Sequence, residues 1–218
     1  MMAEMAKGKR GFTLVEMLVV IGIIAVLAAA SMIGYSKVVK SAKKSKTQEL
    51  VSNAAVALTQ MLSKNGDVWP EYLTDRVDAK GNGILDKEVS KIFVQYNLLG
   101  LSYKRKDKNG GNGPDNIELT GKDRCGVVDA EAEAVLKRSQ TAGDGAKVPS
   151  GKTVKEHILY FAIDREGTGI TEANVKGETL KIRAVAVVWA AGPDGVVDYA
   201  SVGRNDDVYS WRPAQVKK

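Results

Sequence analysis

The sequence is poor in residues that crosslink a domain, bind metals or perform covalent catalysis. Its 218 residues include one cysteine, Cys125, and one histidine, His157. A single cysteine excludes a disulfide within the chain, and a single histidine excludes a multi-histidine metal site. No Gly-rich phosphate loop of the Walker type occurs. Because nothing in the sequence places Cys125 near His157 as nucleophile and base, we expect no enzymatic activity.

The charge balance is only mildly basic. The formal net charge is +6, and Lys7, Lys9 and Arg10 lie just before Gly11. An excess this small, spread along the chain, does not predict nucleic-acid binding, and we expect no nucleic-acid partner. Hydrophobic residues make up 44% of the chain, which is typical of a protein that folds around a core.

The N-terminal region contains one long apolar run. Residues 12–32 carry a single charged side chain, Glu16. As a helix this run would be about 30 Å long, which matches the hydrocarbon thickness of a bilayer. A secretory signal has a shorter apolar core that is followed by its small-residue cleavage site. Here the small residue, Gly11, precedes the run, so cleavage there would leave the apolar helix on the mature chain.

Glu16 is the unusual residue of this run. An acidic side chain inside a membrane segment costs about 2.5–3.5 kcal/mol on insertion scales and therefore needs a partner. One interpretation places Glu16 near the end of the span, where it reaches the lipid head groups. The other pairs it with a positive charge from another subunit. Cleavage after Gly11 would create such a charge, the α-amine of Phe12, and a low dielectric strengthens the pair.

Residues 9–18, with the sequence KRGFTLVEML, resemble the cleavage and methylation motif of type IV pilins and type II secretion pseudopilins. The resemblance implies cleavage between Gly11 and Phe12 by a prepilin peptidase, N-methylation of Phe12, and a role for Glu16 in assembly. It also implies partners: further copies of the chain, minor pseudopilins and an inner-membrane assembly platform. Many pilins have a proline partway along this segment, whereas this chain has only Gly22 and Gly34 there.

The resemblance implies an α+β fold in which a long N-terminal helix packs on a small antiparallel sheet. We divide the chain into a leader (1–11), a transmembrane or filament-core helix (12–35), an amphipathic second half of that helix (36–64) and a globular head (65–218). A helix over residues 12–64 would be about 80 Å long, and Asn65-Gly66 is a plausible stop. One apolar stripe at three- and four-residue steps supports the second half: Leu50, Ala54, Ala57, Leu58, Met61 and Leu62.

The expected location follows from the same resemblance. We expect a single pass through the inner membrane, with a cytoplasmic N-terminus and a periplasmic head, and then a periplasmic or cell-surface filament. The positive charges before Gly11 agree with this orientation, but the lysines after the run oppose it by a simple charge count. We interpret these as a solvated or head-group-facing stretch of helix: Lys37, Lys40, Lys43, Lys44 and Lys46.

Strand candidates lie late in the chain. Residues 157–163 are apolar and aromatic, and residues 180–190 alternate before becoming wholly apolar, which predicts two strands. Residues 104–116 and 139–152 have the composition of exposed loops.

The C-terminal segment contains a candidate calcium loop. Four aspartates occur within residues 192–211, and carboxylates held together by a loop favour a cation such as Ca²⁺; alternatively, Pro193-Asp194-Gly195 is a plain turn. The segment resembles the calcium loop of the major type II secretion pseudopilin. That resemblance implies Asp194 and Asp207 as carboxylate ligands and Asp206 as a neighbouring acidic position. The chain departs from it at Val196-Val197, which replace glycines, and in the tail beyond Trp211.

A second stretch, residues 78–88, partly resembles an EF-hand loop at Asp78, Asn82 and Gly83. Lys80 and Val89 occupy positions where that loop needs ligands. We therefore predict a turn followed by a short helix.

Three functions remain open. The leading hypothesis is a structural pseudopilin of a type II secretion apparatus, which polymerises to drive protein export. The alternative is a type IV pilin of a surface fibre for adhesion, motility or DNA uptake. A third, a single-pass calcium sensor that never polymerises, predicts no processing after Gly11.

Overall fold

The structure is a computed structural model that describes residues 12–99, 101, 103–107, 111, 113–119, 159–175, 177–191, 207–212 and 216–217. The chain divides into two compact units, Met1–Ser41 and Ala42–Lys218, and each is described by itself. The predicted leader (1–11) and the predicted loop 139–152 lie outside the described residues.

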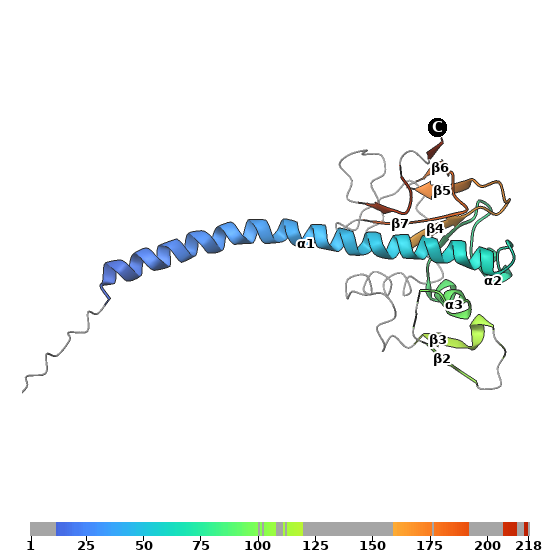
Figure 1. The fold of residues 1–218 in the computed structure, drawn as a ribbon, viewed down its shortest axis with the longest axis horizontal. Coiled ribbons are helices and arrows are strands. Elements are labelled where there is room, and N and C mark those ends of the chain that lie inside the picture. The colour runs from blue at the N-terminus through green and yellow to red at the C-terminus, as the bar shows by residue number, and fades with distance from the viewer. Residues whose placement is uncertain are drawn as a thin grey trace, which may run out of the picture. The chain divides into compact units, whose positions relative to one another are not determined.

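The predicted long helix is present as α1, Leu14–Lys64, with 51 residues (Figure 1). Proline is absent from it and good helix formers dominate its sequence, so no residue interrupts its backbone hydrogen bonds. No helix in the part of the chain that the structure describes is long and apolar enough to cross a membrane.

The second unit combines α1 with small antiparallel sheets, which confirms the predicted α+β class. The strands form a four-stranded sheet of order β1-β4-β7-β8, a two-stranded sheet β2-β3 and a three-stranded sheet β5-β6-β9, and every pairing is antiparallel. The elements are α2 (Glu71–Thr74), β1 (Asn82–Ile84), α3 (Lys87–Gln95), β2 (Tyr103–Arg105), the 3-10 turn η1 (Pro114–Asn116), β3 (Ile117–Leu119), β4 (Leu159–Ile163), β5 (Thr171–Val175), β6 (Glu178–Ile182), β7 (Ala186–Ala190), β8 (Val208–Tyr209) and β9 (Val216–Lys217).

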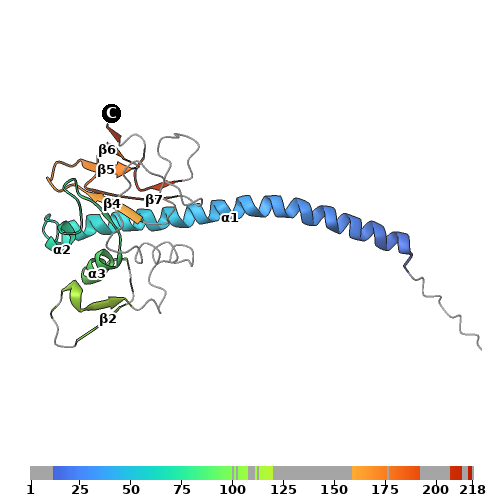
Figure 2. The same cartoon turned by 180° about the vertical axis from the view of Figure 1, so that it is seen from behind.

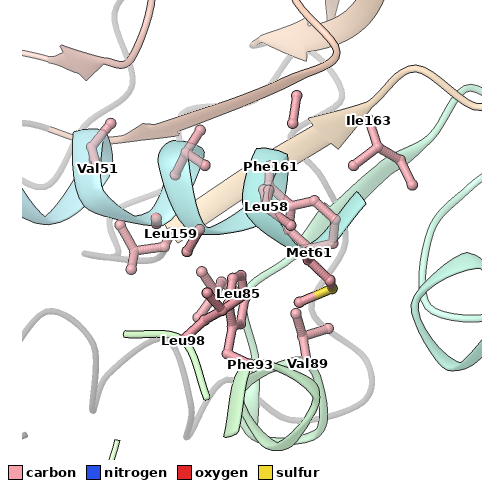
Figure 3. Close-up of a cluster of buried hydrophobic side chains, with 14 of the residues drawn as sticks. Val51, Leu58, Met61, Leu85, Val89, Phe93, Leu98, Leu159, Phe161 and Ile163 are labelled. Carbon is pink, nitrogen blue, oxygen red and sulfur yellow. The ribbon is translucent and has the colours of Figure 1, made fainter. Parts of the chain in front are cut away.

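The core of this unit forms on both sides of the second half of α1. In Figures 1 and 2, α3 with β2 and β3 lies on one side of this half and the strands β4 to β7 lie on the other. Figure 3 shows side chains of α1 gathered with those of β4 and α3. The predicted stripe is buried at Leu50, Ala54, Ala57, Leu58 and Met61, and Val51 joins it. Val51 precedes Ala54 by three residues and Leu58 by seven, so it belongs to the same buried face of the helix.

The predicted strand over residues 180–190 is wrong as a single element. The chain bends at residues 183–185, so β6 and β7 belong to different sheets. Most of β6 is exposed or half-buried, whereas all five residues of β7 are buried. An alternating strand fits a sheet with one solvated face, and an apolar run fits one covered on both faces. One straight strand cannot occupy both environments.

The segment 104–116, which the sequence predicts as an exposed loop, contains the end of β2 and the turn η1. The predicted strand 157–163 corresponds to β4, whose described residues begin at Leu159.

The end of α1 confirms the predicted stop at Asn65-Gly66. Gly66 has φ 71°, and its N–H donates to the Ser63 carbonyl at 3.3 Å while the Asp67 N–H donates to the Leu62 carbonyl at 3.0 Å. These two bonds define a Schellman motif, in which the left-handed residue allows the last carbonyls of the helix to be satisfied.

Leu58 provides a test of this packing, because its side chain is fully buried. We expect Leu58→Ala to lower the free energy of unfolding by about 2–5 kcal/mol through lost contacts and a cavity. Val56, two residues away on α1, is 55% exposed, and Val56→Ala should change it by less than about 0.5 kcal/mol. Urea unfolding of the full chain followed by tryptophan fluorescence measures both. Equal effects of the two substitutions would contradict the assigned burial.

Candidate processing and assembly site

The start of α1 presents apolar side chains on every side of the helix. Phe12 is 75% exposed and Leu14 80% exposed, and large apolar side chains remain exposed at most positions as far as Leu27. Consecutive helix positions point in different directions, so the exposed apolar surface surrounds the helix. A continuous apolar surface of this size marks an interaction with another protein or with lipid.

Thr13 and Glu16 form a reciprocal hydrogen-bonded cap on α1. The Glu16 Oε2 atom accepts from the Thr13 backbone N–H and from the Thr13 hydroxyl, both at 2.8 Å. In return, the Glu16 N–H donates to Thr13 Oγ1 at 3.2 Å. This is a capping box, in which two N–H groups that a helix leaves unpaired are satisfied by side chains.

The capping box changes the interpretation of Glu16. The partners expected from the sequence are lipid head groups or a neighbouring subunit, and neither involves Thr13. The signal was present, because Thr-Leu-Val-Glu matches the Thr-x-x-Glu pattern of the box. A carboxylate has acceptor capacity on both oxygens, and both hydrogen bonds that the Glu16 side chain makes to Thr13 use Oε2. Its role in assembly remains a prediction, and Gly11 lies outside the described residues.

The predicted calcium ligands are only partly described. Asp194 and Asp206 lie outside the described residues, and Asp207 is buried, with 4% exposure. Its Oδ2 atom accepts from the Tyr209 hydroxyl at 2.9 Å. The Tyr209 carbonyl accepts from Gln48 Nε2 of α1 at 2.9 Å. Asp207 is therefore a rigidly held carboxylate at the end of the candidate loop. Among the described residues, no three acidic, cysteine or histidine side chains gather as a metal site.

Aromatic side chains pack around the pair of strands β7 and β8. Trp189 stacks on Tyr160 with ring centroids 5.8 Å apart, and Trp211 meets it edge-on at 6.0 Å. Tyr209 contacts Trp211 at 4.8 Å. Large aromatic surfaces buried together stabilise this end of the sheet. Trp211 is four residues after Asp207 in sequence, and Trp189 pairs with Tyr209 of the neighbouring strand.

The second candidate loop has a structural role. Asp78 Oδ1 accepts from the backbone N–H groups of Lys80 and Asn82 at 2.9 and 2.8 Å, which closes the turn before β1. Gly81 has φ 85°, and a Cβ there would lie 2.2 Å from the Ile163 carbonyl oxygen. The predicted helix follows as α3, which Asp86 caps by accepting from the Val89 N–H at 2.8 Å. Burial raises the pKa of Asp86, and this bond opposes the shift.

Comparison with known proteins finds similarity concentrated on type IV pilins. Residues 6–32 match the family model of the prokaryotic N-terminal methylation motif. The chain is 26% identical over 134 residues to a fimbrial protein of Neisseria meningitidis serogroup A / serotype 4A, with 62% of this chain and 78% of that protein covered. It is 27% identical over 101 residues to the type IV major pilin protein PilE of Neisseria gonorrhoeae, covering 46% of this chain and 60% of that protein. No solved structure matches the chain.

The long N-terminal helix, the antiparallel sheets and the methylation motif together define a pilin-type architecture. The methylation motif and the two pilin relatives support a type IV pilin-like family for this chain.

The capping box predicts the effect of two substitutions at Thr13. Thr13→Val removes the hydroxyl at nearly constant shape, and we expect the start of α1 to lose about 1 kcal/mol of local stability. Amide hydrogen exchange in the first turn should then become about fivefold faster. Thr13→Ser retains the hydroxyl and serves as the control, with exchange close to that of the original chain. The same exchange rates in both variants would refute the capping box.

Proposed function

We propose that the chain is a structural filament subunit that is cut after Gly11 and N-methylated at Phe12 by a prepilin peptidase. The observation that carries this proposal is the apolar surface that surrounds the start of α1, within the residues that match the methylation motif. Polymerisation buries that surface between the helices of neighbouring subunits, and the hydrophobic effect provides the driving force. The role is structural, and the chain is a substrate of processing enzymes.

Before assembly, the same surface needs an apolar environment. We place residues 12–35 in the inner membrane as a single pass, with the N-terminus in the cytoplasm and the head in the periplasm. The assembly platform and minor subunits then receive the processed chain at the membrane. The completed filament lies in the periplasm or at the cell surface.

Glu16 has two separate roles in this proposal. Within its own subunit it closes the capping box through Oε2. In the filament its negative charge pairs with the α-amine of Phe12 on a neighbouring subunit, for which the second carboxylate oxygen is suitable. An ion pair surrounded by apolar helices is much stronger than one in water, so it favours one stagger between subunits over others.

Two filament systems fit the chain. The acidic C-terminal segment, with Asp207 held in a buried position, favours a type II secretion filament that drives protein export. The names of the two relatives, a fimbrial protein and a type IV major pilin, favour a surface fibre for adhesion, motility or DNA uptake.

We further propose a calcium ion in the C-terminal loop, with Asp194 and Asp207 as ligands and Asp206 beside them. The fit rests on Asp207, a buried carboxylate whose position is held by Tyr209. Calcium accepts carboxylate and backbone oxygens in flexible geometry. Bound there, it would hold the loop closed in a chain that has no disulfide.

The charge of Glu16 can be tested separately from its cap. Glu16→Gln retains the capping box, because glutamine fits the same position, but it lacks the charge. We expect mass spectrometry to show that this variant is cut after Gly11, and yet sedimentation to recover at least about tenfold fewer filaments, because the ion pair between subunits is lost.

Glu16→Ala removes both the cap and the charge and should assemble no better than Glu16→Gln. Filament yield from Glu16→Gln equal to that of the original chain would exclude charge pairing as the assembly determinant. An uncut original chain in cells that contain a prepilin peptidase would exclude the filament proposal itself.

Calcium is tested by thermal unfolding of the full chain with excess Ca²⁺ and with chelator. Ca²⁺ at a hundredfold excess over Kd adds about 2.7 kcal/mol, which should raise the Tm by about 5–10 °C. Asp207→Asn and Asp194→Asn should abolish this rise, whereas Asp78→Asn, in the structural turn, should leave it intact. Identical curves with and without Ca²⁺ would remove the calcium site and, with it, the support for the secretion system.

A further inference from the structure

The head contains a polar and aromatic pocket that the filament proposal does not use. It has a volume of about 420 Å³ and lies where the end of α3 meets β2 and β3. Its most informative lining residues are Gln95, Tyr96, Asn97, Tyr103, Arg105 and Asn116. In Figure 1, α3 lies next to these strands. The volume falls within the range of sites for small ligands.

One wall of the pocket is a face of β2. Tyr103 and Arg105 are two positions apart, so they point to the same side of the strand, and both line the pocket. Lys104 points to the opposite side, where its Nζ lies 3.2 Å from Glu118 Oε2 of β3. The strand pairing Lys104↔Glu118 and Arg105↔Ile117 fixes this alternation.

Two further residues make the pocket rigid. The side-chain amide of Asn116 forms hydrogen bonds with two residues of the β2–β3 connection, Asp107 and Gly111. It accepts from the Asp107 N–H at 3.0 Å and donates to the carbonyls of Asp107 and Gly111 at 3.1 and 3.2 Å. Tyr96 is anchored through its hydroxyl, which donates to Asn65 Oδ1 at 2.9 Å. Burial raises the pKa of the Tyr96 phenol.

Asn97 occupies a backbone position that usually belongs to glycine. Helix α3 ends in a Schellman motif, with the Leu98 N–H donating to the Phe93 carbonyl at 2.8 Å and the Asn97 N–H to the Val94 carbonyl at 2.9 Å. Asn97 is the left-handed residue of this motif, with φ 53°. At the end of α1 the same position is Gly66. Non-glycine residues in this conformation are strained, and such strain often accompanies function.

The side chain of Asn97 is available for a ligand. Within the described residues, the side-chain amides of Gln95 and Asn97 and the hydroxyl of Tyr103 make no hydrogen bond, and all three side chains are exposed. The exposed amide of Asn97 therefore faces the pocket and solvent, where a ligand can replace water as its hydrogen-bond partner.

We propose that this pocket binds a saccharide unit. The tyrosine rings offer flat apolar faces with a polar edge, which suit the C–H face of a pyranose. The amides of Gln95 and Asn97 each offer donors and acceptors, which suit neighbouring hydroxyl groups that are both donor and acceptor. Among the described lining residues no side chain is a carboxylate, so the pocket disfavours cations. The site would allow the heads of an assembled filament to bind a saccharide, whatever the mechanism by which the filament assembles.

Saturation-transfer NMR on the full chain tests this proposal directly. The chain is held in a phosphocholine detergent, whose head group contains no sugar. The probes are N-acetylglucosamine, galactose and glucuronic acid at millimolar concentration, with a tyrosine- and arginine-free peptide as the comparison ligand. We expect transfer to the ring protons of at least one sugar. The absence of saturation transfer to all three sugars, or transfer to the peptide alone, overturns the proposal.

Variants at Asn97 and Tyr103 locate the site. Asn97→Gly removes the amide and relieves the strained backbone, so the Tm should stay or rise while sugar affinity falls about tenfold. Asp67, with φ 61° at the end of α1, lies outside the lining residues, and Asp67→Gly is the matched control with unchanged affinity. Tyr103→Ala should weaken binding about three- to tenfold, and Tyr103→Phe much less. Equal binding by the original chain, Asn97→Gly and Tyr103→Ala overturns the assignment.

Discussion

The structure depends on one constraint: α1 is a single helix whose two halves need different surroundings. From Leu50 to Met61 most of its apolar residues lie in a core that the same chain provides, with β4 on one side and α3 on the other. From Leu14 to Leu27 its large apolar side chains are exposed all around the helix. The hydrophobic effect makes the first arrangement stable within one molecule, and it makes the second depend on lipid or on other molecules. The exposed apolar surface of the first half of the helix therefore requires contact with lipid or with other molecules.

In the proposed filament, Glu16 would satisfy a local and an intermolecular need together. An acidic residue in an apolar segment is costly if it has no partner. The capping box with Thr13 gives it two hydrogen bonds inside its own subunit, in a form that helix ends need anyway. Its charge remains for the positive N-terminus that processing would create. Because the cap and the charge can be separated by a glutamine, the two contributions are experimentally distinct.

Two features of the head, the Asn97 side chain and the buried Asp207, lie where hydrogen bonds constrain the structure. The ends of α1 and α3 close with the same hydrogen-bonding motif, but one uses Gly66 and the other Asn97. A glycine suffices where only the turn matters, whereas the asparagine adds an amide beside a pocket. At the other side of the head, the buried Asp207 is held by Tyr209 and by aromatic packing. Both features sit on rigid elements, which is what precise binding requires.

Features that depend on residues close together in the chain can be predicted from the sequence. Helix α1, its stop at Asn65-Gly66, its buried stripe and the turn before α3 all follow from local periodicity and turn chemistry, and the Thr-x-x-Glu pattern equally predicts the Thr13–Glu16 cap. The division of residues 180–190 between two sheets follows from tertiary packing, because burial on one or both faces depends on what packs there. The pocket likewise needed the fold. Asn97 and Tyr103 come together only through the packing of α3 against the register of β2 and β3, and no local pattern encodes that contact.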